Sequence, residues 1–295
     1  LDPDRPALIA QVYGRMVASD IKLVLLNQYP DDHPVTIVSG AGAPGPRVAT
    51  LPLRDLDRRD GLDDLTTVAV PALGRPGSML SLADVVARLR APDGCPWDRE
   101  QTHRSLRPYL LEEAHEVLDA LDAEDAPALA DELGDLLLQV VLHAQIAVEE
   151  GEFGLTDVIR SITEKLVRRH PHVFGDVTAE TSAAVVANWE ALKAEERAAR
   201  GADADPLAGV PLGLPALARA QALLRKGARA GQAHDAADPA AELAAAAARL
   251  GAAPDAAGLG DLLLSAVRVA VALDIDAESA LREATARRAA GRHPA

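Results

Sequence analysis

Two acidic stretches that lie close together in the sequence most constrain how this chain can fold. Glu113 and Glu116 are three residues apart, and so are Glu132 and Asp135. On a helix, residues at this spacing lie on one face about one turn apart. The sequence therefore predicts two helices, each carrying a pair of carboxylates on one face.

The second of these helices has the stronger pattern. At about 100° per residue, one stripe roughly 80° wide holds its polar side chains, namely Glu132, Asp135, Gln139 and His143. The rest of the helix is almost wholly Leu, Val, Ile and Ala, which predicts that it is buried. Carboxylates facing a packed interior are unfavourable unless a cation or hydrogen-bond donors compensate them. The pattern therefore favours a metal site over a solvated acidic face.

The kind of ligand indicates the kind of metal. Carboxylate oxygens without cysteine suit a hard cation such as Mg²⁺ or Mn²⁺ better than zinc. Mg²⁺ usually keeps several waters and takes phosphate oxygens from a substrate, so a nucleotide polyphosphate is the expected guest. A di-iron carboxylate site is the alternative, but it takes Glu-x-x-His from two helices. The Glu-x-x-Glu and Glu-x-x-Asp spacings of this chain favour magnesium.

Several further motifs accompany the acids. The sequence reads GCPWDREQTH at 94–103, ELGDLLLQVV at 132–141, KLVRRHPHVFG at 165–175 and NWEALK at 188–193. In this order and spacing, residues 79–200 resemble the MazG family of all-α nucleoside triphosphate pyrophosphohydrolases. The resemblance is specific because separated motifs match together.

The resemblance implies an enzyme that hydrolyses nucleoside triphosphates to a nucleoside monophosphate and pyrophosphate, in nucleotide-pool house-cleaning. Mg²⁺ or Mn²⁺ would be held by Glu113, Glu116, Glu132 and Asp135. The attacking water would be oriented by Glu116 or by Glu112, which the sequence does not separate.

The resemblance also assigns residues to the substrate. Lys165, Arg168 and Arg169 would neutralise the outer phosphates, although a basic helix end also complements the helix dipole. Trp189 and Lys193 would contact the nucleotide; the alternative for Trp189 is a place in the core. A homodimer is the expected assembly, since all-α members of this type build the bundle from two chains.

The remaining chain divides into further segments. Residues 1–77 predict a small α/β piece, with a helix over residues 6–28 and three β-type runs. They resemble the C-terminal half of a tetrapyrrole methylase without its cofactor-binding half. The catalytic helical domain would span 78–200 and a linker 201–215. Residues 216–295 read as a degenerate helical repeat, because GDLLL at 134–138 recurs at 260–264. The fold class is therefore mainly α.

Finer expectations concern helix ends and faces. Ser81 and Ser105 are predicted to cap the helices that follow them. The first acidic helix is expected to present its apolar stripe to the core, through Leu111, Ala114, Leu118 and Leu121. In the repeat, Arg268 is expected to neutralise Asp261, and the alanine-rich segment 233–257 to be poorly ordered.

Composition limits the partners. The net charge of −15 argues against a nucleic-acid backbone as the main partner. A single cysteine, Cys95, is consistent with the reducing cytoplasm. No apolar run is long enough for a membrane span, and no signal peptide opens the sequence. Two rival functions remain: a nucleotide-binding regulatory protein without turnover, and a phosphoribosyl-nucleotide pyrophosphohydrolase.

Overall fold

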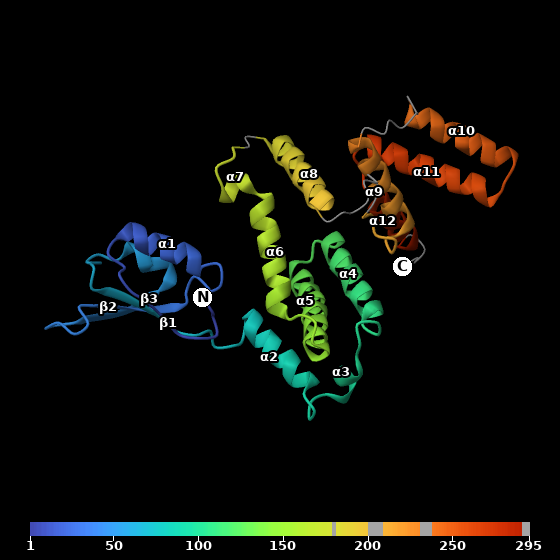
Figure 1. Ribbon diagram of the computed structural model, residues 1–295. Coiled ribbons are helices and arrows are strands. Elements are labelled where there is room, and N and C mark those ends of the chain that lie inside the picture. Colours follow the sequence, from blue (N-terminus) through green and yellow to red (C-terminus); the bar gives the residue numbers. More distant parts are fainter. Residues whose placement is uncertain (179–180, 200–208, 231–237, 291–295) are drawn as a thin grey trace. The chain divides into compact units, whose positions relative to one another are not determined.

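The computed structural model describes residues 1–178, 181–199, 209–230 and 238–290. Contacts divide the chain into two compact units, Leu1–Arg168 and Arg169–Ala295, and each is described by itself. Helices make up most of the chain, and one small sheet lies near the N-terminus (Figure 1). The predicted fold class is therefore confirmed, while the division into four segments stays a prediction.

The first unit begins with a small antiparallel sheet. Its elements are β1 (Ala7–Ile9), α1 (Arg15–Leu25), β2 (Pro34–Ser39), β3 (Arg47–Pro52), the 3₁₀ helix η1 (Leu53–Arg58) and β4 (Thr66–Val70). The strand order is β1-β4-β2-β3. Side chains alternate along β2 and β4, so that Val35, Ile37 and Val68 enter a core shared with α1 and η1. The three predicted β-type runs are confirmed, and the likeness to a methylase half stays a prediction.

The helix predicted within residues 6–28 is shorter than expected. Ala7–Ile9 instead forms β1, which pairs with β4 through Ile9 and Val68. Gln11 then takes a positive φ of 60°, and the extended Gly14 precedes the first residue of α1. Pairing at the sheet edge therefore outweighs the helical spacing of the apolar residues here, because the spacing also fits an edge strand followed by a turn.

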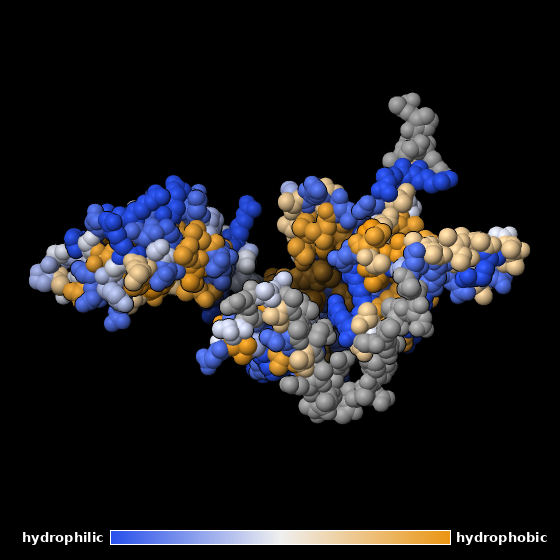
Figure 2. All heavy atoms as spheres, turned by 90° about the horizontal axis from the view of Figure 1, so that it is seen from above, coloured by the Kyte–Doolittle hydropathy of each residue, from blue (hydrophilic) through white to orange (hydrophobic). Residues whose placement is uncertain are grey.

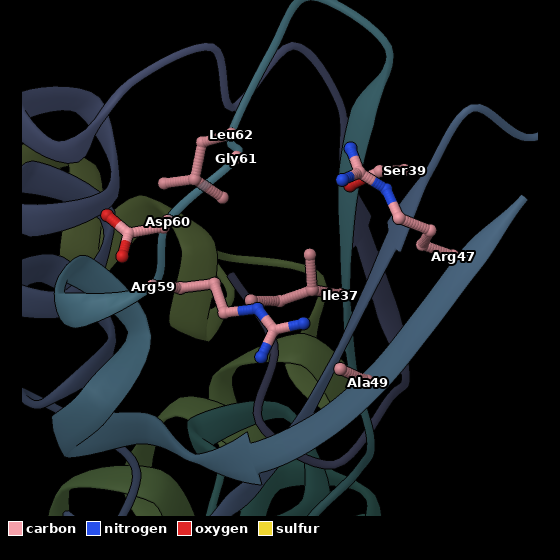
Figure 3. A pocket seen from close by; sticks show the side chains of 8 residues that line it. All are labelled: Ile37, Ser39, Arg47, Ala49, Arg59, Asp60, Gly61 and Leu62. Atoms are coloured by element: carbon pink, nitrogen blue, oxygen red, sulfur yellow. The ribbon is translucent and has the colours of Figure 1, made fainter.

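A small cavity lies against the sheet. Figure 3 shows its lining residues, with Ile37 and Ser39 from β2, Arg47 and Ala49 from β3, and Arg59 to Leu62 from the segment after η1. Its volume is about 30 Å³, room for little more than a few waters. Asp60, its only acid, is paired with Arg15. The cavity is too small for a nucleotide.

Helices make up the rest of the first unit. They are α2 (Met79–Arg90), α3 (Pro96–Glu100), α4 (Arg107–Asp122), α5 (Ala126–Glu150) and α6 (Leu155–Arg169). Asp125 caps α5 by accepting a hydrogen bond of 3.1 Å from the Ala128 amide. Gly151 ends α5 in the left-handed region, at φ 76°.

The two predicted serine caps are wrong. Ser78, not Ser81, caps α2 and accepts a 3.1 Å hydrogen bond from the Ser81 amide. Ser105 lies before α4 and exchanges hydrogen bonds with Thr102 in the preceding turn. The buried Leu106 occupies the cap position of α4. In both places the N-cap position falls on a neighbouring residue, Ser78 for α2 and Leu106 for α4.

The core of the helical part is smaller than the sequence suggests. It consists of Val86, Leu106, Val141, Leu142 and Ile146. On α5 the buried residues therefore lie between 139 and 147, and the acidic N-terminal half is open. The predicted apolar stripe of α4 is also wrong for three residues, because Leu111, Leu118 and Leu121 are exposed. Figure 2 shows such apolar side chains, in orange, on the surface.

The second unit is helical throughout its described part. Its helices are α7 (Pro171–Phe174), α8 (Ser182–Ala199), α9 (Ala216–Arg229), α10 (Pro239–Ala252), α11 (Ala256–Ala272) and α12 (Ala277–Ala290). Helices α10 and α11 form a hairpin, and Asp255 caps α11 as Asp125 caps α5. The repeated GDLLL sequence thus lies on the second helix of both hairpins.

Two expectations for the repeat are wrong. Most of its alanine-rich segment forms α10, since alanine has the highest helix propensity; residues 233–237 lie outside the described residues. Arg268 of α11 pairs across the hairpin with Glu242 of α10 at 2.5 Å, and not with Asp261. The cross-hairpin geometry therefore decides which acid the arginine neutralises.

The length and apolar character of the described helices bear on whether any of them could span a membrane. No single helix among them is long and apolar enough to cross a bilayer. The bent pair α11 and α12 meets the length and composition requirements only when the two helices are taken together.

A matched pair of leucines on α1 tests the first core. Leu25 is 2% exposed and Leu23 is 60% exposed. Replacing a buried leucine with alanine removes apolar contacts and leaves a cavity, so Leu25→Ala should lower the free energy of unfolding by about 2–5 kcal/mol. Leu23→Ala should change it by less than about 0.5 kcal/mol. Urea unfolding followed by circular dichroism measures both, and equal losses would contradict this packing.

Asp4 joins the N-terminal segment to the start of α2. Its carboxylate accepts hydrogen bonds from the amides of Gly77 at 2.9 Å and Ser78 at 3.0 Å, and from the Ser81 hydroxyl. The hydrogen bonds of Ser81 and Ser78 lower the pKa of Asp4 from 3.8 to about 2.

A lowered carboxyl pKa stabilises the fold above the unfolded value, and the stabilisation is lost as pH falls through the folded value. We therefore expect the Asp4 contribution to be complete above pH 3.8 and lost towards about pH 2. A carboxyl ¹³C NMR titration measures the pKa directly. Ser81→Ala should move it back towards 3.8, and an unshifted Asp4 in the parent chain would contradict the contact.

Candidate functional site

The α4–α5 hairpin brings the two acidic stretches together. The helices run side by side, and the short turn at 123–125 joins them (Figure 1). One carboxylate oxygen from each of Glu113, Glu116 and Glu132 lies within 4.8 Å of the other two. We call these three residues the acid group. It contains acids from both helices, as the spacing predicted.

Burial and the neighbouring charges raise the pKa of two members of the acid group, Glu113 and Glu132. The pKa of Glu113 is raised by partial burial first, and then by the charges of Asp135 and Glu116. The pKa of Glu132 is raised by burial, and then by Glu116 and Asp135. Asp135 therefore lies near enough to act on both, although it is not one of the three closest acids. All four predicted metal ligands belong to one negative site.

The surroundings of this site differ from the expectation. Glu113 and Glu132 are only half-buried, and Glu116 and Asp135 are exposed. The predicted burial of the acids in a packed interior is therefore wrong for the isolated chain. Mutual repulsion in a partly solvated site still favours a cation between them.

The donor atoms suit a hard divalent cation. Every side chain of the site offers carboxylate oxygen, with no sulfur or imidazole nitrogen in the group. Mg²⁺ and Mn²⁺ prefer such ligands, and one or two carboxylates are enough to hold Mg²⁺ with its remaining waters. The residues present therefore fit a divalent metal ion.

The two candidates for orienting water are placed differently. Glu116 belongs to the acid group, whereas Glu112 is exposed and does not join it among the described residues. The assignment of either residue to the water stays a prediction. Its position makes Glu116 the candidate with the shorter reach to a bound metal.

Three of the five predicted substrate residues lie on α6, of which Lys165 and Arg168 belong to the first unit and Arg169, its last residue, to the second. Lys165 is half-buried and Arg168 is exposed. In the second unit, Arg169 and Lys193 both contact Trp189. Lys193 Nζ lies 4.1 Å from the centroid of the Trp189 ring, and the Arg169 guanidinium lies 5.7 Å from it. The indole thus has two cations on it, an arrangement stabilised by the ring quadrupole.

Further contacts define this basic and aromatic group. Arg169 also pairs with Glu196, with Nη2 to Oε2 at 2.6 Å. The Trp189 indole Nε1 is buried without a hydrogen-bond acceptor among the described residues. A buried indole N–H ordinarily finds an acceptor, so the unsatisfied Trp189 N–H is an unusual feature of this group.

Sequence reasoning missed two polar features of α5. The Gln139 side chain is 5% exposed, and its Oε1 has no partner in the described part of the chain. His143, one turn further along, stacks on His103 and lies 2.7 Å from it between the Nδ1 atoms. His143 was visible on the polar stripe, but nothing in the sequence joined it to His103.

Comparison with known proteins supplies the family. Residues 101–174 match the family described as the MazG nucleotide pyrophosphohydrolase domain. A Thermotoga maritima protein named nucleoside triphosphate pyrophosphohydrolase/pyrophosphatase MazG is 42% identical over 69% of this chain and 80% of its own length. An Escherichia coli nucleoside triphosphate pyrophosphohydrolase is 52% identical over 51% of this chain and 57% of its own.

Another relative extends over more of the sequence. The uncharacterised Bacillus subtilis protein YabN is 46% identical over 73% of this chain, but over 45% of its own length. This chain thus spans about half the length of YabN and of the Escherichia coli relative.

Removing one acid should expose the repulsion. In metal-free protein, Glu113→Gln should raise the free energy of unfolding by under about 1 kcal/mol, because it removes one like charge from a partly solvated site. The same change should reduce the added stability that Mg²⁺ gives the parent chain, because one of its ligands is lost. Thermal unfolding with EDTA and with Mg²⁺ measures both effects. A metal-free loss of stability in Glu113→Gln would contradict the crowding.

Proposed function

This chain belongs to the MazG family, and from that premise we propose that it is a metal-dependent hydrolase of nucleoside triphosphates. Its products would be a nucleoside monophosphate and pyrophosphate. The observation that carries the proposal is the acid group, which lies inside the residues that match the family and brings carboxylates of both hairpin helices within 4.8 Å of one another.

Each residue of the site would have a defined task. Glu113, Glu116, Glu132 and Asp135 would hold Mg²⁺, or Mn²⁺ in its place. When bound, the metal ion supplies charge for the phosphate oxygens and lowers the pKa of a nearby water. Glu116, or Glu112 beside it, would orient that water and take its proton, because a carboxylate within hydrogen-bond reach can act as a general base.

The basic and aromatic residues would bind the substrate. Lys165, Arg168 and Arg169 would neutralise phosphate oxygens that the metal does not reach. Trp189 and Lys193 would bind on the nucleoside side, where an indole face can stack on a base. The unsatisfied Trp189 N–H is consistent with this role, since a movement of the indole on binding would let an acceptor on the substrate satisfy it.

The intact acid group also separates this function from a rival. A purely regulatory nucleotide-binding protein has no need for converging carboxylates, which repel one another without a cation. Substrate breadth would fit a house-cleaning role in the cytoplasm. The phosphoribosyl-nucleotide alternative predicts turnover of one defined substrate and none of ordinary triphosphates.

The active form would be a homodimer. Helix α6 packs against the core through its first residue, Leu155, whereas its later apolar residues are exposed, namely Ile159, Ile162, Leu166 and Val167. Helices α4 and α5 also carry exposed apolar residues, including Leu111, Leu121 and Leu133. Apolar faces of this extent support association, and bundle helices bury such faces against one another.

Product analysis tests the reaction. The parent chain with Mg²⁺ and a mixture of ATP and deoxynucleoside triphosphates should release pyrophosphate and nucleoside monophosphate. Glu132→Gln and Asp135→Asn should each lower kcat by at least about 100-fold, because the metal supplies several kcal/mol of charge stabilisation. Chromatography of the products measures this.

A matched control is Asp119→Asn on α4, an exposed acid outside the acid group, which should retain near-parent turnover. Release of diphosphate and orthophosphate would refute the assigned bond. Binding of nucleotide without any turnover would favour the regulatory protein.

A charge introduced on the apolar face of α6 tests the dimer. Ile162→Asp places a charge on the exposed apolar face, so it should convert the dimer to a monomer. Turnover should fall as well, because the dimer is the proposed active form. Val48→Asp, on an exposed position of β3, should leave the mass unchanged. Size-exclusion chromatography with light scattering measures the mass, and a monomeric parent chain would refute the assembly.

A further inference from the structure

A second group of metal-binding side chains lies at the C-terminal end of α5. It consists of His103, Glu150 and Glu152, whose ligand atoms all lie within 4.8 Å of one another. Glu132 of the acid group precedes Glu150 by 18 residues of helix, about 27 Å along α5. The two groups are therefore separate.

The end of α5 fixes the backbone that carries the exposed side chains of Glu150 and Glu152. The Gly151 amide donates to the carbonyl oxygen of Val148 at 3.1 Å, and the Glu152 amide donates to the carbonyl oxygen of Ala147 at 2.9 Å. This pair of bonds is a Schellman motif, in which the second residue after the cap ordinarily makes an apolar contact. Here that position carries Glu152, a carboxylate. The negative end of the helix dipole adds to the attraction for a cation.

These carboxylates lack a basic partner. Arg90, the nearby arginine, donates two hydrogen bonds to the Glu149 carboxylate, at 2.6 and 2.9 Å. Across the described residues, no lysine or arginine pairs with Glu150 or Glu152, and His103 faces Glu150. Two acids and one imidazole therefore share a site with no fixed cation.

A contact with His143 orients the imidazole of His103. Its Nδ1 lies 2.7 Å from Nδ1 of His143, and the two rings stack with an interplanar angle of 5°. One ring must donate this hydrogen bond to the other. If His103 donates, its Nε2 lone pair points towards Glu150 and needs a cation between them. Histidines that bind metals ordinarily donate their second N–H in this way.

The distances fit a metal better than a proton. His103 Nε2 lies 3.7 Å from Glu150 Oε2, too far for a hydrogen bond. Two ligands about 2.1 Å from a tetrahedral zinc ion lie about 3.4 Å apart, close to this separation. An imidazole with two carboxylates suits a transition ion, whereas Mg²⁺ prefers oxygen alone.

We propose that His103, Glu150 and Glu152 bind a transition-metal ion such as Zn²⁺, at a site separate from the acid group. The ion ties the turn before α4, which carries His103, to the end of α5. His143 is a positioning residue that fixes the ring of His103. The site is independent of hydrolysis, so its test does not use turnover.

The test is Zn²⁺ titration of the full chain in excess Mg²⁺, followed by long-range ¹H–¹⁵N NMR of the histidine side chains. The Nε2 resonance of His103 should move to a metal-bound position. The double variant Glu150→Gln, Glu152→Gln should weaken this binding at least about tenfold, and His143→Phe should weaken it by about 10–100-fold while keeping a stacked ring.

Glu132→Gln is the matched control, since it breaks the acid group and should leave the His103 response unchanged. Circular dichroism of each variant establishes that it is folded. An unchanged His103 resonance at saturating Zn²⁺ would overturn the site. A shift that persists undiminished in the double glutamine variant would overturn it as well, because other ligands would then hold the ion.

Discussion

The antiparallel pairing of α4 with α5 is the constraint on which the candidate site depends. The turn at 123–125 sets the register of the hairpin, and the register decides that Glu113 and Glu116 meet Glu132. The buried residues of α5 lie beyond the acids, so packing at one end holds like charges together at the other. The free energy of the core thus maintains an arrangement that the carboxylates by themselves oppose.

The acidic hairpin and the strands of the sheet could be predicted from the sequence, because the patterns that determine them are local. The three-residue spacing of the acids fixes a helical face, and Asp125 with Pro127 marks the turn between the helices. Alternation in β2 and β4 likewise fixed the strands around Val35 and Val68. In these segments the short-range pattern and the tertiary structure favour the same conformation.

Other features depend on partners distant in the sequence. His103 and His143 are 40 residues apart, and only the fold brings their rings into contact. The choice of Ser78 over Ser81 as a cap follows from Asp4, which occupies the Ser81 hydroxyl. The exposure of Leu111 reflects the absence of a covering surface within the described chain, which periodicity does not predict.

The pairing of Glu242 with Arg268 has a consequence for how the two hairpins respond to their surroundings. In the α10–α11 hairpin the counter-charge is covalently part of the chain, so no chelator can remove it and no dilution can weaken it. Under the proposed function, the α4–α5 hairpin takes its counter-charge from solution, as a divalent ion. If the proposed metal site is correct, the stability of the α4–α5 hairpin depends on the concentration of free divalent ions, whereas the Glu242–Arg268 ion pair of the α10–α11 hairpin does not.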